Sequence, residues 1–268
     1  LEHYAVNVGT SLDGPEDVTD AQRGDGYFAQ TMRGIDLLRA AGRAPGVICT
    51  FTRRSVGDPR RVLSFFVEEG LQVLVHAAIG DDFGRESLRA DEYTSLLLAL
   101  REIEAESGGL VRVSPLRQMR DQIASGVPGT CTFMDCLGDF LAVGPDGRSA
   151  PCNRFLGWPF FATEHPRPGG HDEVRAESPG RAWLVERRRR LPLSCTECAY
   201  HGICHGGCPY NVLVRLPLDR DGRPPSATAI PPERLVDPYC ETYRSIYDVL
   251  LDGIVRERLV GFLDPPRV

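Results

Sequence analysis

Eight of the nine cysteines lie between residues 131 and 240. Two residues separate Cys195 from Cys198, a spacing that lets both sulfurs reach one metal centre. Cys204 and Cys208 follow, with two glycines between them that allow the backbone to turn closely around a ligand. The candidate ligands are Cys131, Cys136, Cys152, Cys195, Cys198, Cys204, Cys208 and Cys240.

A predicted β-hairpin connects the upstream cysteines. The Asp-Gly pair at 146–147 is a hairpin turn signal, and the apolar segment 141–143 precedes it. The second strand would end at Cys152, so the hairpin would bring Cys152 back toward Cys131 and Cys136.

Eight thiolates suit two sites of four cysteines each. Zinc and iron–sulfur clusters both accept four cysteine ligands, and spacing alone does not choose between them. Disulfides would require an oxidising compartment, and no secretion signal is found, so we expect reduced thiols and a cytoplasmic protein. Cys49 lies in a predicted strand, where a buried structural thiol is expected.

The first half alternates strand-like and helix-like segments, which is typical of βαβ units and a parallel sheet. Three such units could form half of a (β/α) barrel or a small open sheet. The predicted strands are Tyr4–Leu12, Val47–Thr52 and Leu71–Ile79, and the predicted helices are Phe28–Ala41, Asp58–Gly70 and Asp91–Glu106.

Helical periodicity fades after about residue 125, so we predict two domains, residues 1–125 and 126–268. In the second, only Ala182–Arg190 and Glu241–Leu259 read as helices. The segment Arg215–Pro238 reads as a long surface loop. The arginines of Arg187–Arg190 are expected on a solvated helix face.

The net charge of −6 excludes a basic nucleic-acid footprint. No apolar run reaches the length of about 18 residues that a membrane helix needs. We therefore expect neither nucleic acid nor a membrane among the partners.

The second half resembles the SPASM domain of radical S-adenosylmethionine (SAM) enzymes that modify peptides and proteins. The resemblance rests on Cys136-x10-Gly147-x4-Cys152, on Cys195-x2-Cys198-x5-Cys204-x3-Cys208 and on Cys240. It implies two auxiliary [4Fe–4S] clusters in place of zinc. It also implies an interleaved ligand partition, with Cys131, Cys136, Cys152 and Cys208 holding one cluster and Cys195, Cys198, Cys204 and Cys240 the other.

The first half is similar to the same enzymes around Ser11-Leu-Asp-Gly-Pro15 and the following Arg23. The resemblance implies that Ser11, Asp13 and Arg23 help to bind SAM. It implies an α/β fold in which the C-terminal half of a partial (β/α)6 TIM-type barrel precedes a small cysteine-rich SPASM domain with a β-hairpin and a C-terminal helix.

The CxxxCxxC motif that holds the radical-generating cluster in this family is absent from the sequence. Because the chain starts with Leu1 in place of Met and a core strand is predicted from Tyr4 onward, we expect a fragment that lacks roughly 100 upstream residues of the barrel. SAM and a third [4Fe–4S] cluster are then expected only in a full-length form, and the chain alone is expected to be inactive.

The resemblance implies a peptide or protein substrate, such as a ribosomally made precursor peptide, and an electron donor such as ferredoxin or flavodoxin. Sulfatase-maturing members of the family carry a catalytic aspartate where this chain has Asn153, and an amide takes no proton at neutral pH. The competing hypotheses are a non-catalytic iron–sulfur scaffold, a peptide-recognition subunit and, less favoured, a zinc-stapled structural domain. His201 and His205 are expected to lie beside cluster sulfur.

Overall fold

The computed structural model describes residues 7–80, 84–134, 136–137, 140–163 and 178–263. The chain divides into two compact units: unit 1 comprises Leu1–Arg120 with Asp248–Val268, and unit 2 comprises Asp121–Tyr247. The predicted division at residue 125 stays a prediction.

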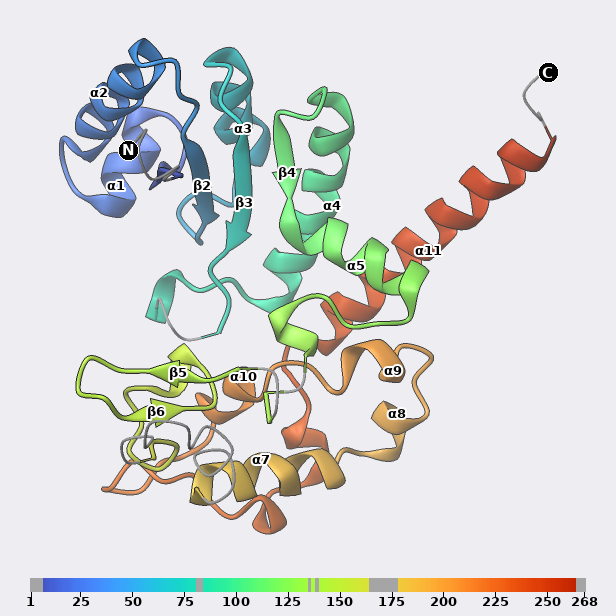
Figure 1. Cartoon of the computed structure of the whole chain (residues 1–268). Coiled ribbons are helices and arrows are strands. Elements are labelled where there is room, and N and C mark those ends of the chain that lie inside the picture. The colour runs from blue at the N-terminus through green and yellow to red at the C-terminus, as the bar shows by residue number, and fades with distance from the viewer. Residues whose placement is uncertain (1–6, 81–83, 135, 138–139, 164–177, 264–268) are drawn as a thin grey trace. The chain divides into compact units, whose positions relative to one another are not determined.

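Unit 1 is built on a four-stranded parallel sheet in the order β1-β2-β3-β4 (Figure 1). Thr10 of β1 pairs with Val47 of β2, while Cys49 of β2 pairs with Val75 of β3. The strands are β1 (Gly9–Ser11), β2 (Gly46–Phe51), β3 (Val73–Ala77) and β4 (Val111–Val113). Because all four strands are parallel, their carboxyl ends lie along one edge of the sheet.

Helices connect these strands. They are α1 (Glu16–Arg23), α2 (Tyr27–Ala40), α3 (Pro59–Glu68), α4 (Ala90–Glu106) and α5 (Ser114–Ser125), which continues into unit 2; a short turn, η2 (Gly84–Glu86), precedes α4. The Asp58 side chain accepts a hydrogen bond from the Arg61 N–H and caps α3, and Pro59 occupies its first turn.

One face of the sheet carries the core of unit 1. The buried strand side chains alternate along the chain, and the intervening Ile48, Leu74 and Arg112 are exposed. Helices α3 and α4 contribute Leu63, Phe66 and other apolar side chains to this core. The buried strand residues are Val47, Cys49, Phe51, Val73, Val75, Val111 and Val113.

The structure confirms the α/β class, the three long helices of the first half and the strands at β2 and β3. The expectation of three strands was wrong, because β4 follows the double glycine at 108–109 and has only three residues. A three-residue strand is too short for a periodic apolar pattern to reveal. The first predicted strand is observed at Gly9–Ser11; its residues 4–6 lie outside the described ranges.

Unit 2 consists of short elements. In chain order they are η3 (Cys131–Phe133), β5 (Ala142–Val143), β6 (Ser149–Ala150), η4 (Asn153–Phe155), α7 (Pro179–Arg189), α8 (Leu193–Thr196), α9 (His201–Cys204), α10 (Pro209–Leu213), η5 (Ala227–Ala229), η6 (Pro232–Leu235) and the start of α11 (Cys240–Leu263). The predicted hairpin is confirmed: β5 and β6 pair in antiparallel fashion, and Gly147 takes a φ of 77° in the turn. Among the helices in the described ranges, none has both the length and the apolar character needed to cross a bilayer.

An aromatic core stabilises unit 2. The rings of Phe155 and Phe161 stack with centroids 4.3 Å apart, and Trp183 and Tyr210 belong to the same buried cluster. The segment 215–238 was predicted as a surface loop, which was wrong in part, because Ala227, Ile230 and Leu235 are buried in this core.

The solvated helix face predicted for Arg187–Arg190 was wrong for Arg187, whose exposed fraction is only 4%. Arg187 lies three residues after the buried Leu184 and four after the buried Trp183. Residues at these spacings lie on one face of a helix, so Arg187 is buried on the same face of α7 as Trp183 and Leu184.

Candidate functional site

The first group of cysteines gathers around Cys136. Cys131 starts η3, Cys152 precedes η4 and Cys208 precedes α10, so three distant segments contribute. Burial first, and then the neighbouring Cys208, Cys152 and Cys131, raise the pKa of the Cys136 thiol to about 12. Protons on these thiols must therefore be displaced when a metal centre binds.

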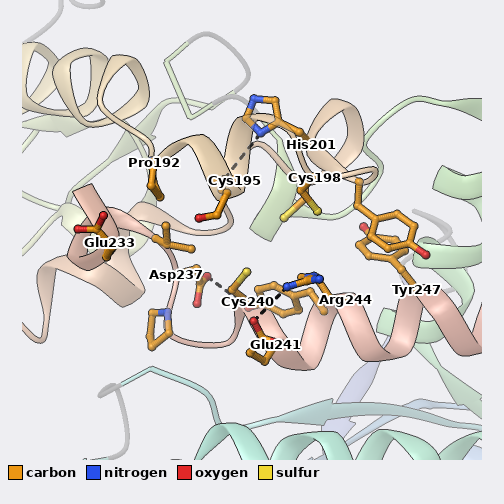
Figure 2. A pocket seen from close by; sticks show the side chains of 17 residues that line it. Pro192, Cys195, Cys198, His201, Glu233, Asp237, Cys240, Glu241, Arg244 and Tyr247 are labelled. Atoms are coloured by element: carbon orange, nitrogen blue, oxygen red, sulfur yellow. Dashed lines mark hydrogen bonds and ion pairs between the residues drawn. The ribbon is translucent and has the colours of Figure 1, made fainter. Parts of the chain in front are cut away.

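The second group lines a cavity of about 340 Å³ in unit 2. Cys195 lines it from α8, Cys198 from the turn after α8, Cys204 from the end of α9, and Cys240 from the first residue of α11. Figure 2 shows Cys195, Cys198 and Cys240 around this space, with His201 on one side and Asp237 and Arg244 on the other. The site is thus assembled from segments up to 45 residues apart in sequence, from Cys195 to Cys240.

The thiols of this group also act on one another. Burial and the nearby Cys240, Asp237 and Cys195 raise the pKa of Cys204 to about 12. Burial and Glu241, followed by Cys195 and Cys198, raise the pKa of Cys240 to about 11. The thiols that act on Cys204 and Cys240 therefore all belong to the second group.

The donor set of the second group fits a cluster. Within the described ranges, no three His, Cys, Asp or Glu side chains converge tightly enough to hold one metal ion. The four thiols surround a hollow, whereas a tetrahedral zinc site draws each sulfur to about 2.3 Å from a single ion. A [4Fe–4S] cluster binds each thiolate to a different iron and so fills such a hollow. Whether the groups bind clusters stays a prediction.

Arg154 supplies positive charge to the first group. Its Nη1 donates to the Cys208 sulfur over 3.7 Å and to Asn211 Oδ1 over 3.2 Å. The guanidinium lies 3.9 Å from the centroid of the Tyr210 ring, a cation–π contact that fixes its orientation. Arg154 directly follows Asn153 in the sequence.

Asp237 ties the two groups together. Its exposed fraction is 2%, and its side chain accepts hydrogen bonds from the Cys208 N–H over 2.8 Å and the Asn211 Nδ2 over 3.0 Å. The Tyr239 N–H and the Tyr243 hydroxyl donate to the same carboxylate. The backbone carbonyl of Asp237 accepts the Cys240 N–H over 2.9 Å, so one residue positions a ligand of each group.

The two histidines of the cysteine run make different contacts. The Nδ1 atom of His201 lies 3.7 Å from the Cys195 sulfur, the neighbour relation expected from the sequence. The Nδ1–H of His205 donates to the Phe133 carbonyl over 2.9 Å, and His205 takes a left-handed backbone conformation with φ 53°. His205 therefore joins η3 to the end of α9.

Unit 1 places the residues predicted to bind SAM at the carboxyl end of β1. Ser11 ends the strand, and the buried Asp13 accepts bonds from Arg23 Nε over 2.5 Å and Nη2 over 3.1 Å. The Thr50 N–H and the Gln22 amide also donate to the Asp13 carboxylate. These bonds show that Asp13 orients the Arg23 guanidinium. A role for Ser11, Asp13 and Arg23 in binding SAM stays a prediction. Cys49 is fully buried in this unit, and burial raises the pKa of its thiol.

Removing the Asp13 carboxylate is expected to destabilise unit 1. The Asp13→Ala change leaves Arg23 and the Thr50 N–H without their acceptor, and breaking a buried pair of this kind costs about 3 kcal/mol. Urea unfolding of the full chain measures the loss. The matched control is Asp17→Ala, which breaks the exposed pair with Arg61 and is expected to change the midpoint little. Equal midpoints for the two variants would contradict the structural role of Asp13.

Three site residues were not found from the sequence: Arg154, Arg187 and Asp237. The spacing of Arg187 from Trp183 and Leu184 was a signal that could have indicated its burial. Arg154 and Asp237 gave no such signal, because their partners Cys208 and Asn211 lie 26–57 residues away.

Among curated proteins, two uncharacterised ones match parts of the chain. A protein of Methanothermobacter thermautotrophicus is 36% identical over 114 residues, covering 41% of this chain and 44% of its own length. A protein of Synechocystis is 38% identical over 75 residues, covering 26% of this chain and 19% of its own length. The chain thus spans less than half of these relatives. No protein-family model matches it.

Solved structures match most of the chain in fold. Native anSMEcpe with bound AdoMet superposes with a TM-score of 0.71 at 17% identity, covering 96% of this chain and 69% of that one. SuiB of Streptococcus suis bound to S-adenosylmethionine gives 0.53 at 13% identity, covering 76% of this chain and 49% of that one. A structure of native anSMEcpe with AdoMet and the Kp18Cys peptide gives a TM-score of 0.65 at 17% identity, and the match covers 93% of this chain and 68% of that one. The α/β fold of this chain, with its parallel four-stranded sheet, therefore matches part of the radical SAM/SPASM enzymes anSMEcpe and SuiB.

Proposed function

We propose that unit 2 binds two [4Fe–4S] clusters through two groups of four cysteines. Cys131, Cys136, Cys152 and Cys208 would hold the first, and Cys195, Cys198, Cys204 and Cys240 the second. The observation that carries this proposal is the cavity lined by the four cysteines of the second group. The mutual effects of Cys136, Cys152, Cys131 and Cys208 on the pKa of Cys136 support the first group.

We further propose that the chain is the C-terminal portion of a radical SAM enzyme that modifies a peptide or protein. The fold similarity to anSMEcpe, which has been solved with bound peptides, supports this. Ser11 and Arg23, at the carboxyl edge of the sheet, would contact SAM. The barrel that completes such a site, the third cluster and the CxxxCxxC motif would come from sequence outside these 268 residues.

Bound clusters of this kind supply one-electron transfer, and the protein holds and insulates them. Free thiols ready for cluster ligation fit a reducing compartment, so we propose a cytoplasmic protein that receives electrons from ferredoxin or flavodoxin. Asn153 offers no base, which argues for a modification other than sulfatase maturation. A ribosomally made precursor peptide is the substrate class that fits.

A non-catalytic scaffold or peptide-recognition subunit is the competing function, because the sequence contains no CxxxCxxC motif. The two functions differ in what the reconstituted chain does with SAM and dithionite. Cleavage of SAM by this chain alone would exclude the non-catalytic reading. No cleavage alone, with cleavage restored by a chain extended upstream in its reading frame, would support the enzyme.

Anaerobic purification and reconstitution test cluster binding directly. We expect about eight iron and about eight sulfide per chain, with broad absorption near about 400 nm, since two clusters of four irons are proposed. The same preparation is offered zinc as a competing metal. About two zinc per chain with no sulfide would contradict the clusters and favour the zinc-stapled domain.

A further inference from the structure

Arg187 is a charged side chain inside unit 2. It belongs to the last turn of α7, and its exposed fraction is 4%. The neighbouring Arg188 and Arg189 are exposed to solvent. Of these three consecutive arginines, only Arg187 is buried in the core of unit 2. A guanidinium stays protonated in proteins, so a full positive charge is held in a region of low dielectric.

Two backbone carbonyls fix the guanidinium in place. Arg187 Nε donates to the Leu235 carbonyl over 2.9 Å, and Nη2 donates to the Gly206 carbonyl over 2.6 Å. Gly206 lies between Cys204 of the second group and Cys208 of the first. Arg187 is therefore bound to the short segment that joins the two groups of ligands.

The two carbonyl oxygens accept hydrogen bonds from Nε and Nη2 of Arg187 but carry no net charge to balance the guanidinium. Burial lowers the pKa of Arg187, and Asp237, Cys208, Cys136 and Cys195 oppose this effect by Coulomb attraction when they are ionised. Cys208 and Cys136 belong to the first group and Cys195 to the second. Arg187 and Cys136 also line one small cavity together with Gly207. The charge thus lies beside Cys136 of the first group and is bonded to Gly206, which stands between Cys204 of the second group and Cys208 of the first.

We propose that Arg187 is a shared counter-charge of the two clusters and raises the reduction potential of both. The proposal rests on the proposed function of unit 2. A cluster held by four thiolates is anionic, and reduction adds a further negative charge. A fixed cation beside it favours the reduced form by Coulomb attraction, and at this position the same cation acts on two clusters.

The test uses the full chain, reconstituted anaerobically, in wild-type form and as Arg187→Gln, Arg187→Lys and Arg189→Gln. Glutamine keeps N–H groups without the charge, lysine keeps the charge, and Arg189 is an exposed neighbour on the same helix. Iron and sulfide are measured first, and the two midpoint potentials are then obtained from redox titration followed by electron paramagnetic resonance.

For Arg187→Gln we expect both midpoint potentials to become more negative. A tenfold fall in the equilibrium constant for reduction corresponds to about 59 mV in a one-electron couple, and we expect a shift of that order. Arg187→Lys and Arg189→Gln are expected to stay much closer to the wild type. Loss of the clusters in Arg187→Gln together with their retention in Arg187→Lys would equally support the need for the charge.

Two results would overturn the role of Arg187. One is an Arg187→Gln variant with full iron and unchanged potentials. The other is the loss of clusters in both Arg187 variants, which would show that the guanidinium serves only to hold the Gly206 and Leu235 carbonyls. A wild-type chain that takes up no clusters would instead overturn the proposed function, so the two failures are distinguishable.

Discussion

Replacing Cys136 by alanine is expected to halve the iron of the reconstituted chain, from about eight to about four per chain. Cys136 belongs to the first group, and Cys208, Cys152 and Cys131 all help to raise the pKa of its thiol. Cys204→Ala is expected to halve the iron as well, but by removal of the other cluster. Paramagnetic resonance spectra of the two reduced variants should therefore show complementary signals that together account for the wild-type spectrum.

Cys208 provides the sharpest test of the interleaved partition. It lies only four residues after Cys204, yet it is assigned to the cluster of Cys136. Cys136→Ala/Cys208→Ala is expected to keep about four irons, and Cys204→Ala/Cys208→Ala to lose nearly all of them. The opposite pattern, in which Cys208 pairs with Cys204, would reject the partition.

Cys49→Ala is the matched control for these variants. Cys49 is buried in β2 of unit 1 and belongs to neither group. Its replacement creates a small cavity that lowers stability, while the iron content should stay at the wild-type level.

The elements that the sequence predicted well are those in which local pattern and tertiary packing agree. The apolar positions of α4 recur at helical spacing, and the structure buries Tyr93, Leu96, Leu97 and Leu100 from this helix. The Asp-Gly pair at 146–147 produced a hairpin because glycine adopts the positive φ of that turn at no steric cost.

The elements that the sequence missed carry too little local pattern. Helix α1 is mainly polar, and only Thr19 is buried among its residues. Its role becomes visible in three dimensions, because Gln22 and Arg23 at its end reach the Asp13 carboxylate. Because α1 positions polar groups and buries almost no apolar side chains, its sequence lacks the apolar stripe from which a helix is predicted.

The candidate site shows the same limit. The types and spacing of the cysteines predicted the candidate ligands, whereas their partition into two groups of four is implied by the resemblance and stays a prediction. The groups that surround them come from elsewhere: Arg187 from α7, Arg154 from η4 and Asp237 from the segment before α11. Their charges matter because they are buried together, and burial depends on the whole fold of unit 2.

Adding a single methyl group at Gly207 is expected to disrupt the connection between the two groups. Gly207 has φ +71°, and a Cβ there would lie 2.4 Å from Asp237 Cβ and 2.7 Å from Asp237 Oδ2. Asp237 would therefore have to move. Its carboxylate accepts the Cys208 N–H and its backbone carbonyl accepts the Cys240 N–H, so both cysteines would be displaced with it. We expect Gly207→Ala to lower the unfolding free energy by about 2–4 kcal/mol, from overpacking and from the left-handed backbone.

Gly202→Ala is the matched control for Gly207→Ala. Gly202 lies in α9 between Cys198 and Cys204, in the same cysteine run as Gly207, and a Cβ there would meet nothing within 4 Å. Alanine favours a helix over glycine, so this variant should keep its iron and unfold no more easily than the wild type. Gly207→Ala should lose more than half of its iron, because the displaced Asp237 accepts the backbone N–H groups of Cys208 and Cys240, one proposed ligand of each cluster. Equal iron content and equal urea midpoints in the two alanine variants would show that Asp237 does not position the ligands. The paired comparison therefore separates the geometry around Asp237 from a general sensitivity of the cysteine run to substitution.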